Sequence, residues 1–366
     1  GDSFGLENVL WFANNKEDAY EEPTIKRSRS HNYVSKEVIN VRENVGIIEV
    51  ANFSKHEFKG PDARKFLDFI MAGRLPKPGR ISLSPMLSYR GKLCGDLTVT
   101  CLDENEFIVF GSGAAQEMHR RWFESHLGKF NVNYNNRSDE FHGLSIAGPN
   151  SRKVLEKIVR EDISNEKFKF RDSRRMFVGG VPAIVNRISF TGELGYEIYV
   201  APHYQIKLYE ELIQAGKEFT IKPFGGRALM SMRLEKNWGA WTLDYRPDFT
   251  AKETGLDTFI NWNKEFIGKE NAKKDNSTNK IVPLIVETNE IDVTNNEAVV
   301  NGKDSIGYVT SGGFAHYVNK SVAFTFLDQN KINYDNKIQI EINGDLFNCS
   351  LIKDSLYDPT GQKMRS

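Results

Sequence analysis

The sequence contains few cysteines, and those that it has form no recognisable set. Cys94, Cys101 and Cys349 are odd in number and lack the spacing of a zinc site. The seven histidines are scattered, and no two of them lie four residues apart as on a zinc-binding helix. We therefore expect no metal centre. We also expect reduced thiols in a reducing compartment, which favours the cytoplasm.

An excess of charge of either sign is also missing, because Lys plus Arg and Asp plus Glu both number 49. Proteins that bind nucleic acids or anionic membranes usually carry a basic excess. No apolar run approaches the ~20 residues that cross a bilayer, and the polar N-terminus does not resemble a signal peptide. Neither a nucleic acid nor a membrane is therefore expected as a partner.

The sequence does have enough apolar residues to bury more than one core. Hydrophobic residues make up 39% and charged residues 27% of the 366 residues, which is typical of a globular protein with two or three domains. Residues 1–44 are polar and weakly patterned, as in an arm that lies over the surface. The polar cluster at Lys273–Lys280 predicts a linker. Residues 281–366 then alternate in short strand patterns, for example at Ile338, Ile340 and Ile342, and predict a separate antiparallel β-barrel.

Two pairs of similar segments indicate an internal duplication. The segment "KGPDARKFLDFI" at Lys59–Ile70 resembles "AGPNSRKVLEKI" at Ala147–Ile158, with an offset of 88 residues. The segment "RGKLCGDLTV" at Arg90–Val99 resembles "TGELGYEIYV" at Thr191–Val200, with an offset of 101 residues. Because both matches occur in the same order, we predict two related α+β halves, at about 45–140 and 141–272.

The second match aligns Asp96 with Glu197, so each half would carry one acid at the same point of the same strand. Glu197 and Tyr199 share one face of that strand. Two halves related by a pseudo-twofold axis would bring both carboxylates to one cavity. Glu197 could then bind a ligand with two parallel N–H donors, such as the edge of a pterin. Asp96 could accept a proton or stabilise a cation near a reacting nitrogen.

Plainer interpretations of these residues stay open. Glu197 could be a solvated side chain on a half-exposed strand, and Asp96 could be a turn aspartate that caps the start of a strand. Arg227, at the start of a helical segment, is either an ion-pair residue or a group that supports Glu197 or a ligand oxygen. The segment "FIVFGSGAAQE" at Phe107–Glu117 is similar to a dinucleotide fingerprint, but Gln116 replaces its third small residue. We interpret it as a glycine turn into a helix.

Four motifs in sequence order resemble one family. They are "GDLTVTCLDENEFIVFGSGA", "RISFTGELGYEIYV", "GGRALMSMRLEKNWGAWTLDYRPD" and "TGLDTFINWNKEFIGKENA". Together they are similar to the folate-binding, C-terminal half of dimethylglycine and sarcosine dehydrogenases. That half itself resembles the aminomethyltransferase, or T-protein, of the glycine cleavage system. The resemblance runs from about Phe4 to Asp358, and it implies a ring of three parts, two α+β halves and the barrel, around a central channel for tetrahydrofolate.

The resemblance also implies roles for single residues. Asp96 matches the family's catalytic aspartate, Glu197 matches its pterin-binding strand, and Arg227 matches an arginine of the T-protein site. Phe190 stands where relatives often have tyrosine, and Thr258 stands where some have a pterin-facing tyrosine, so a hydroxyl contact and a ring would be lost. The implied cofactor-binding residues are Asp96, Leu97, Thr98, Phe190, Glu197, Ile198, Tyr199, Arg227 and Thr258.

The implied activity is capture of a one-carbon unit from a methylated amine, such as dimethylglycine or sarcosine, as 5,10-methylenetetrahydrofolate. The flavin-binding part of those dehydrogenases has no counterpart in this sequence, so a flavoprotein domain or subunit is an expected partner. One alternative is direct methyl transfer from a betaine or sulfonium donor, for which Trp238, Trp241 and Tyr245 offer an aromatic pocket. Another is a non-catalytic, folate-binding accessory protein. The sequence leaves the donor and the oligomeric state open.

Overall fold

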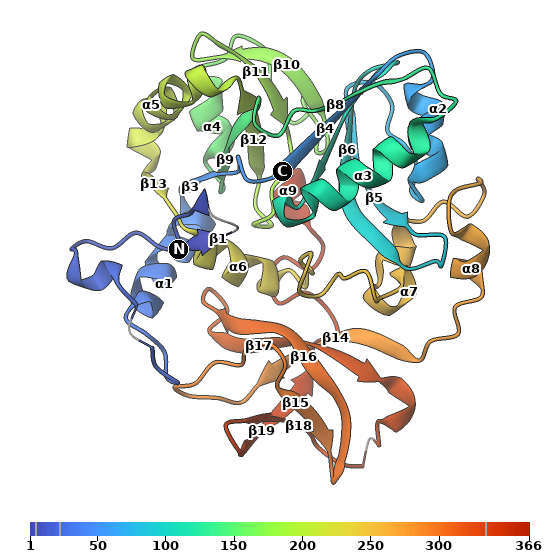
Figure 1. Ribbon diagram of the computed structural model, residues 1–366. Helices are drawn as coiled ribbons and strands as arrows, with labels where there is room; N and C mark the ends of the chain where they lie inside the picture. The colour runs from blue at the N-terminus through green and yellow to red at the C-terminus, as the bar shows by residue number, and fades with distance from the viewer. Residues whose placement is uncertain (4–5, 22, 334) are drawn as a thin grey trace.

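The computed structural model describes residues 1–366 except 4–5, 22 and 334. Phe4, where the family resemblance begins, lies outside the described residues. Figure 1 shows three parts: two sheets with their helices in the upper part of the view, and a barrel below them, with helix α6 (Gly226–Glu235) between. The expected α+β fold, with two related halves and a C-terminal antiparallel barrel, is confirmed.

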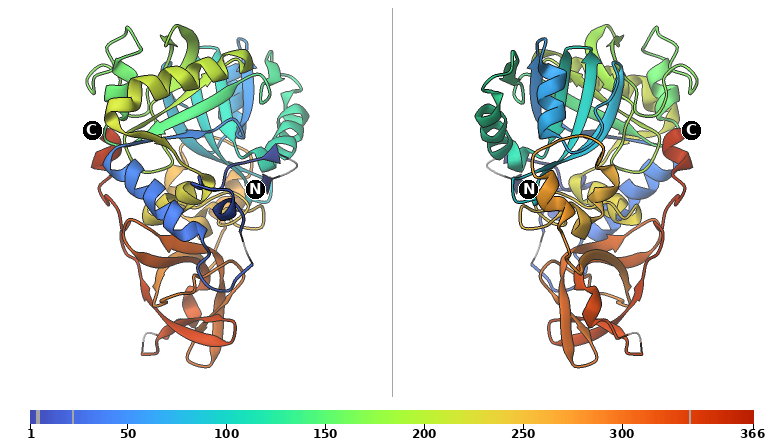
Figure 2. Two further views of the ribbon diagram at one scale, coloured as in Figure 1. Left: turned by 90° about the vertical axis from the view of Figure 1, so that its left-hand side faces the viewer. Right: turned by 90° about the vertical axis from the view of Figure 1, so that its right-hand side faces the viewer.

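Each half contains one sheet and the helices that pack against it (Figure 2). The first-half sheet has the order β5-β6-β7-β4-β8 and the second-half sheet the order β10-β11-β12-β9-β3-β13. The first-half strands are β4 (Ser54–Lys59), β5 (Arg80–Leu87), β6 (Leu93–Asp103), β7 (Glu106–Gly111) and β8 (Asn133–Asn136). The second-half strands are β3 (Val45–Glu49), β9 (His142–Ala147), β10 (Ser173–Val178), β11 (Val181–Asn186), β12 (Gly195–Val200) and β13 (Ile221–Pro223).

The helices cover the outer faces of the sheets and fill the joints between the three parts (Figure 2). The α-helices are α1 (Ser30–Glu43), α2 (Ala63–Ile70), α3 (Gln116–Leu127), α4 (Ser151–Glu156), α5 (Gln205–Gly216), α6, α7 (Ala251–Thr254), α8 (Lys269–Lys273) and α9 (Gln362–Arg365). The described helices include none that is long and apolar enough to cross a membrane.

The order of elements confirms the duplication. The first half runs β4-α2-β5-β6-β7-η2-α3 and the second β9-α4-β10-β11-β12-η3-α5, where η2 (Gly113–Ala115) and η3 (Pro202–Tyr204) are short 3-10 helices. The offset of 88 residues relates β4 and α2 to β9 and α4. At the turn before each of these helices, Gly60 and Gly148 have nearly the same φ, +132° and +133°, which favours glycine in both copies.

The second sequence match, with its offset of 101 residues, is wrong. β12 lies between β11 and β9, and the strand in the same position of the first half is β7, between β6 and β4. Glu197 of β12 pairs with Ser145 of β9 just as Ile108 of β7 pairs with Glu57 of β4, which gives an offset of 89 residues. Asp96 lies on β6, whose counterpart is β11. The two acids therefore come from non-equivalent strands.

The N-terminal 44 residues do more than lie over the surface. Helix α1 buries Val34, Val38 and Val41 against α6, where Met232 belongs to the same apolar cluster. β3, which the sequence placed in the first half, pairs with β9 in the second-half sheet. The segment therefore forms part of the core that joins the second half to α6.

The C-terminal part is a closed six-stranded barrel, as expected. Its strand order is β14-β17-β16-β15-β18-β19, and all neighbouring strands are antiparallel. Closure leaves no free sheet edge to pair with another chain. The strands are β14 (Asn279–Val286), β15 (Ala298–Asn301), β16 (Asp304–Ala315), β17 (Lys320–Asp328), β18 (Ile338–Ile342) and β19 (Asp345–Leu351); a two-stranded hairpin, β1 (Asp2–Ser3) and β2 (Leu6–Glu7), lies at the N-terminus.

Candidate functional site

The two sheets face each other across a space whose centre is apolar. Phe110 of β7 and Tyr199 of β12 are counterparts in the duplication, and their ring centroids lie 4.7 Å apart. Ile108 and Ile184 belong to the same buried cluster. Because side chains alternate along a strand, these residues mark the inward faces of both sheets.

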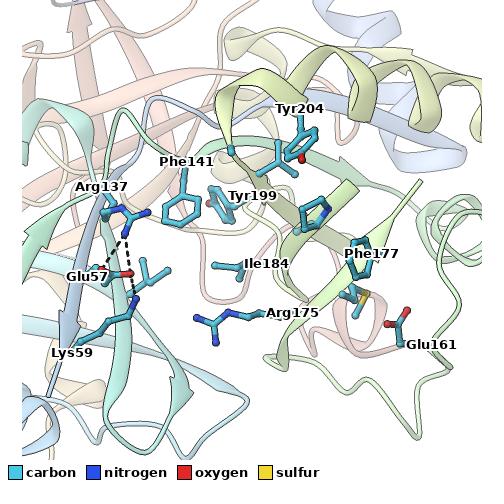
Figure 3. Close-up of a pocket in the computed structure, with 16 residues that line it drawn as sticks. Glu57, Lys59, Arg137, Phe141, Glu161, Arg175, Phe177, Ile184, Tyr199 and Tyr204 are labelled. Carbon is cyan, nitrogen blue, oxygen red and sulfur yellow. Dashed lines mark hydrogen bonds and ion pairs between the residues drawn. The ribbon is translucent and has the colours of Figure 1, made fainter. Parts of the chain in front are cut away.

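A cavity of about 500 Å³ lies at one end of this space (Figure 3). Ile108, which precedes Phe110 on β7, lines this cavity together with Val200 and Ala201, which follow Tyr199 at the end of β12 and just beyond it. The strands β7 and β12 therefore run in opposite directions across the space. Residues that follow Phe110, or that precede Tyr199, lie toward the other end.

Asp96 and Glu197 both lie toward that other end, on facing sheets. Thr98 pairs with Phe110, and Asp96 lies two residues further from the cavity on the same face of β6. Glu197 lies two residues from Tyr199, again away from the cavity, on the same face of β12. The structure thus places the two predicted acids on facing sheets, toward the same end of the space, although they do not come from equivalent strands. We call this region the acid end and the other the cavity end.

Glu197 is buried, with an exposed fraction of 7%, so the interpretation as a solvated residue on a half-exposed strand is wrong. The Tyr199 hydroxyl donates a hydrogen bond of 2.8 Å to Glu197 Oε2. Burial raises the pKa of Glu197 to about 7, although the Tyr199 hydrogen bond and the charge of Lys55 act in the opposite direction. Ile198 points the other way, into the core of the second half. It can therefore offer a ligand only its backbone.

Lys55 is a member of this site that the sequence did not reveal. It lies on the inward face of β4, is fully buried, and its Nζ donates to the carbonyls of Ala51 at 2.5 Å and Phe53 at 2.7 Å. Nζ also lies 5.9 Å from the centroid of the Tyr199 ring. Burial lowers the pKa of Lys55 to about 8, and the charge of Glu197 opposes this shift. Its ammonium group therefore favours the ionised form of Glu197.

Asp96 is half-buried and lies inside β6, where it pairs with Pro85, so it is not a turn residue that caps the strand. Burial raises the pKa of Asp96 to about 7. Among the described residues, no side chain donates a hydrogen bond to its carboxyl group. Thr98 shares the inward face with Asp96, whereas Leu97 is packed in the first-half core and can offer only its backbone.

The loop after α6 lies next to Asp96. Burial, followed by the charge of Asp96, raises the pKa of Tyr245. The Phe190 ring stacks on Trp238, with centroids 5.8 Å apart and an angle of 28° between the rings. A buried ion pair of 2.6 Å between Arg233 and Asp244 holds this loop, and Arg233 also donates to the Trp238 carbonyl at 3.0 Å. The aromatic residues of this loop are thus held in place by α6.

A second buried network holds the loop that leads into β12. Arg42 of α1 donates to the Thr191 carbonyl at 2.7 Å and forms ion pairs with Glu193 at 3.1 Å and Glu235 at 2.6 Å. The Tyr357 hydroxyl donates to Glu193 as well. These partners come from α1, α6 and the C-terminal segment, so no local sequence pattern could have indicated them.

Arg227 and Thr258 are not brought to the acids. Arg227 forms an ion pair with Glu21, donates to Ser30 Oγ at 2.7 Å, and lies 4.9 Å from the Trp11 ring centroid. Within the described parts of the chain, no contact joins Arg227 to Glu197. Thr258 is exposed and donates to the Gly255 carbonyl. Their roles toward a ligand stay predictions.

Family models decide what kind of protein this is. Residues 1–264 match the model described as the GCVT N-terminal domain, and residues 279–358 match the glycine cleavage T-protein C-terminal barrel domain. The chain belongs to the glycine cleavage T-protein family. Aminomethyltransferases of this family bind tetrahydrofolate, and membership makes the chain a folate-dependent enzyme.

Individual T-protein relatives agree with this assignment. The chain is 33% identical over 360 residues to mitochondrial dimethylglycine dehydrogenase of Mus musculus, an alignment that covers 96% of this chain and 41% of the relative. It is 28% identical over 330 residues to the aminomethyltransferase of Thermoanaerobacter pseudethanolicus, with 88% and 89% covered. The chain thus spans about two fifths of the length of the dehydrogenases that it matches. The crystal structure of aminomethyltransferase T from Bartonella henselae shares the fold, with a TM-score of 0.80 at 21% identity over 89% of this chain and 90% of that one.

The acid end also contains a buried amide donor without a partner among the described residues, Asn186. Asn186 pairs with Glu197 in the β11–β12 ladder and therefore shares its inward face. The Asn186 Oδ1 accepts from Ser173 Oγ, but its buried Nδ2 has no partner in the described residues. A buried amide donor beside a buried carboxylate suits the edge of a pterin, which has both N–H donors and acceptor atoms. Among the described residues, no group of three or more His, Cys, Asp or Glu side chains could hold a metal ion.

Proposed function

We propose that this chain takes a methyl-derived one-carbon unit from a methylated amine, such as dimethylglycine or sarcosine, and forms 5,10-methylenetetrahydrofolate. Family membership supports folate-dependent one-carbon transfer, and the similarity to dimethylglycine dehydrogenases supports this class of donor. The observation that carries the proposal is the pair Asp96 and Glu197, two carboxyl groups on facing sheets, each with a pKa raised to about 7.

Glu197 would bind the pterin edge in this proposal. Its carboxylate can accept two parallel N–H bonds, and such charge-assisted pairs are stronger than neutral ones. The Tyr199 hydrogen bond fixes the rotation of the carboxyl group, and the nearby Lys55 ammonium favours its ionised form. The Asn186 amide would donate to an acceptor on the same ring edge, and Phe190 would border the ring.

Asp96 would move the proton. Bound tetrahydrofolate supplies two amine nitrogens, N5 and N10, to which the one-carbon unit is attached. A carboxyl group with a pKa near 7 can both accept and return a proton at neutral pH, which is the condition for efficient general acid–base catalysis. Its negative form also stabilises the cationic iminium of the donor amine. The facing sheets would hold both reactants together, which lowers the entropic barrier.

A mixture of sarcosine and formaldehyde tests this function directly. The two condense to the same iminium that two-electron oxidation of dimethylglycine produces, so no oxidase is needed. We expect the chain to accelerate formation of 5,10-methylenetetrahydrofolate above the rate without protein, and chromatography would separate this product from 5-methyltetrahydrofolate. A rate equal to that of the protein-free control would refute the proposal.

The alternative, direct methyl transfer, would need the aromatic residues of the loop after α6 to bind the cationic methyl donor. Trp238, Trp241 and Tyr245 are close in sequence, but Trp238 stacks on Phe190 and Trp241 packs beside His119, so both rings already have an aromatic neighbour. Formation of 5-methyltetrahydrofolate from glycine betaine or a sulfonium propionate would favour this alternative. A non-catalytic, folate-binding role is disfavoured, because the relatives named above, a dehydrogenase and an aminomethyltransferase, are enzymes.

A flavoprotein is the partner that we propose, as a further domain or as a subunit. It would oxidise the amine and supply the iminium, as the name of the dehydrogenase relatives suggests. We also propose a reducing compartment such as the cytoplasm. Cys94, Cys101 and Cys349 all have free thiols, which supports this location.

A further inference from the structure

The segment of β6 that carries Asp96 receives little support from the sheet ladder. On one side Asp96 pairs with Pro85 of β5, which has no N–H to donate and whose carbonyl accepts from the Ala72 amide at 2.9 Å instead. On the other side the β6–β7 ladder ends at the pair of Thr98 and Phe110. The position of the Asp96 carboxyl group therefore depends on some other contact with this part of the backbone.

A β-bulge lies two residues before Asp96. The β5–β6 register shifts between Met86 and Leu87, which leaves Cys94 as an extra residue on β6. Bulges bend a strand and re-aim the side chains next to them, and they are frequent beside active sites. The Cys94 carbonyl accepts a hydrogen bond of 2.9 Å from Nε2 of His119, a residue of α3. A helix side chain therefore holds the bulge.

The imidazole ring of His119 occupies a space that two glycines leave on the outer face of the first-half sheet, where α3 packs (Figure 1). A Cβ atom on Gly95 would lie 2.9 Å from Nε2 of His119, and one on Gly111 would lie 3.1 Å from Nδ1. Both distances are shorter than ordinary van der Waals contact, so a side chain at either position would displace the ring. Gly95 immediately precedes Asp96, and the ring therefore lies directly behind the strand at that point.

Burial of the His119 ring carries a cost in stability. The residue is 1% exposed, and its Nδ1 has no partner in the described part of the chain. Because a carbonyl can only accept, Nε2 carries the proton, and burial lowers the pKa of His119 to about 4, so the ring is neutral at neutral pH. An apolar side chain of similar size would avoid the unpartnered nitrogen. The contribution that is specific to histidine here is therefore the hydrogen bond to β6.

We propose that His119 is a positioning residue for Asp96. Its hydrogen bond to the Cys94 carbonyl fixes the bulge, and the bulge sets the place of the Asp96 carboxyl group in the space between the sheets. This inference rests on the proton transfer proposed for Asp96. The His119 ring itself lies outside that space, on the opposite face of β6. Its centroid is also 6.1 Å from that of Trp241, so the same ring supports the loop next to Asp96.

Three variants in the sarcosine and formaldehyde assay test this role. His119→Met fills the same space without a donor, and we expect kcat to fall about 10–100-fold, the scale of a misplacement of ~1 Å. The KM for tetrahydrofolate should change little, because Glu197 is untouched. His119→Gln keeps an N–H donor of similar reach and should restore most of the rate. His56→Met is the matched control, because His56 is equally buried beside α3 but is hydrogen-bonded to Tyr134 of β8, and its rate should stay near that of the parent chain.

A double-mutant cycle separates positioning from general damage to the fold. Because His119 acts through the Asp96 carboxyl group, His119→Met should lower the rate no further in the Asp96→Asn background, whereas two independent effects would multiply. The Tm of His119→Met should be close to that of the parent chain, since loss of the hydrogen bond is offset by removal of the unpartnered Nδ1.

Three results would overturn the role of His119 alone: a parent-like kcat in His119→Met, an equal loss in His119→Gln, or independent effects in the cycle. A Tm far below that of the parent chain in His119→Met, but not in His56→Met, would assign His119 to stability instead. A parent chain no faster than the protein-free control would refute the one-carbon function, and the role of His119 with it. The two failures are thus distinguished by the activity of the parent chain.

Discussion

The two ends of the space between the sheets treat their carboxyl groups differently. At the cavity end Glu57 has an exposed side-chain fraction of 4%, with Lys59 at 2.8 Å and Arg137 at 3.3 Å. At the acid end Glu197 and Asp96 have no cation within ion-pair distance in the described structure, and burial raises the pKa of both to about 7. The charge of Glu57 is thus balanced by two cations of the same half, Lys59 and Arg137. The other two retain an unfavourable desolvation energy that a bound ligand can offset, which is typical of a functional site.

Among the substitutions that test this difference between the two ends, replacement of Asp96 is expected to have the largest effect on the catalysed rate. Asp96→Asn keeps the shape of the side chain but removes its ability to carry a proton. We expect the catalysed rate from sarcosine and formaldehyde to fall by about 10²–10⁴-fold, the usual contribution of a general acid–base group. Tetrahydrofolate affinity, measured by calorimetry, should change little. A retained rate would show that the carboxyl group has no part in proton movement.

Glu197→Ala should weaken tetrahydrofolate binding by about 1.5–3 kcal/mol, the value of a hydrogen bond to a charged group. This corresponds to roughly 10–150-fold in the dissociation constant. The control is Ile108→Ala at the counterpart position of β7, which should leave folate affinity nearly unchanged. Equal effects of both substitutions would mean that the two ends do not differ in function.

Glu57→Ala should have the opposite profile, with a loss of stability and normal folate binding. The substitution leaves Lys59 and Arg137 without their shared partner, and both are partly exposed, so water limits the loss. We expect the free energy of unfolding to fall by about 1–3 kcal/mol in urea titrations. A fall in folate affinity of similar size would contradict the assignment of Glu57 to structure.

The smallest expected effect is a gain of stability at high pH when either of the two buried acids, Glu197 or Asp96, is replaced by its amide. A carboxyl group with a folded pKa near 7 binds more protons in the folded chain than in the unfolded chain between about pH 4 and 7. Stability therefore decreases as the pH rises through this window. Glu197→Gln and Asp96→Asn remove this loss, so Tm should rise by about 2 °C or more at pH 8 but not at pH 5. An equal change at both pH values would contradict the raised pKa values.

The sequence predicted the broad architecture because its signals are local. The Gly-Pro turns at 60–61 and 148–149 precede helices in both halves, and the alternation at residues 338–342 belongs to a barrel strand. The match between Arg90–Val99 and Thr191–Val200 failed for a physical reason. Gly91 and Gly192 both have positive φ in a turn before a strand, so the letters agree although the strands occupy different places in their sheets.

The site could be predicted only in part. Alternation along a strand correctly placed Glu197 with Tyr199 and opposite to Ile198. Lys55 and the Arg42 network could not be found, because their partners are brought together by tertiary packing from distant segments. Arg42 and Glu235, for example, are 193 residues apart. Fold-level symmetry, rather than any motif, made the cavity end recognisable as the counterpart of the acid end.

The Arg42 network has a consequence for folding during synthesis on the ribosome. Its members Arg42 and Tyr357 are more than 300 residues apart in the sequence, yet together they fix the segment that leads into β12. Domains usually fold as they emerge, from the N-terminus onward. Here residues up to Tyr357 must be synthesised before its hydroxyl group can donate to the Glu193 carboxylate, so the network that fixes the start of β12 closes only after the second half and the barrel have both been made.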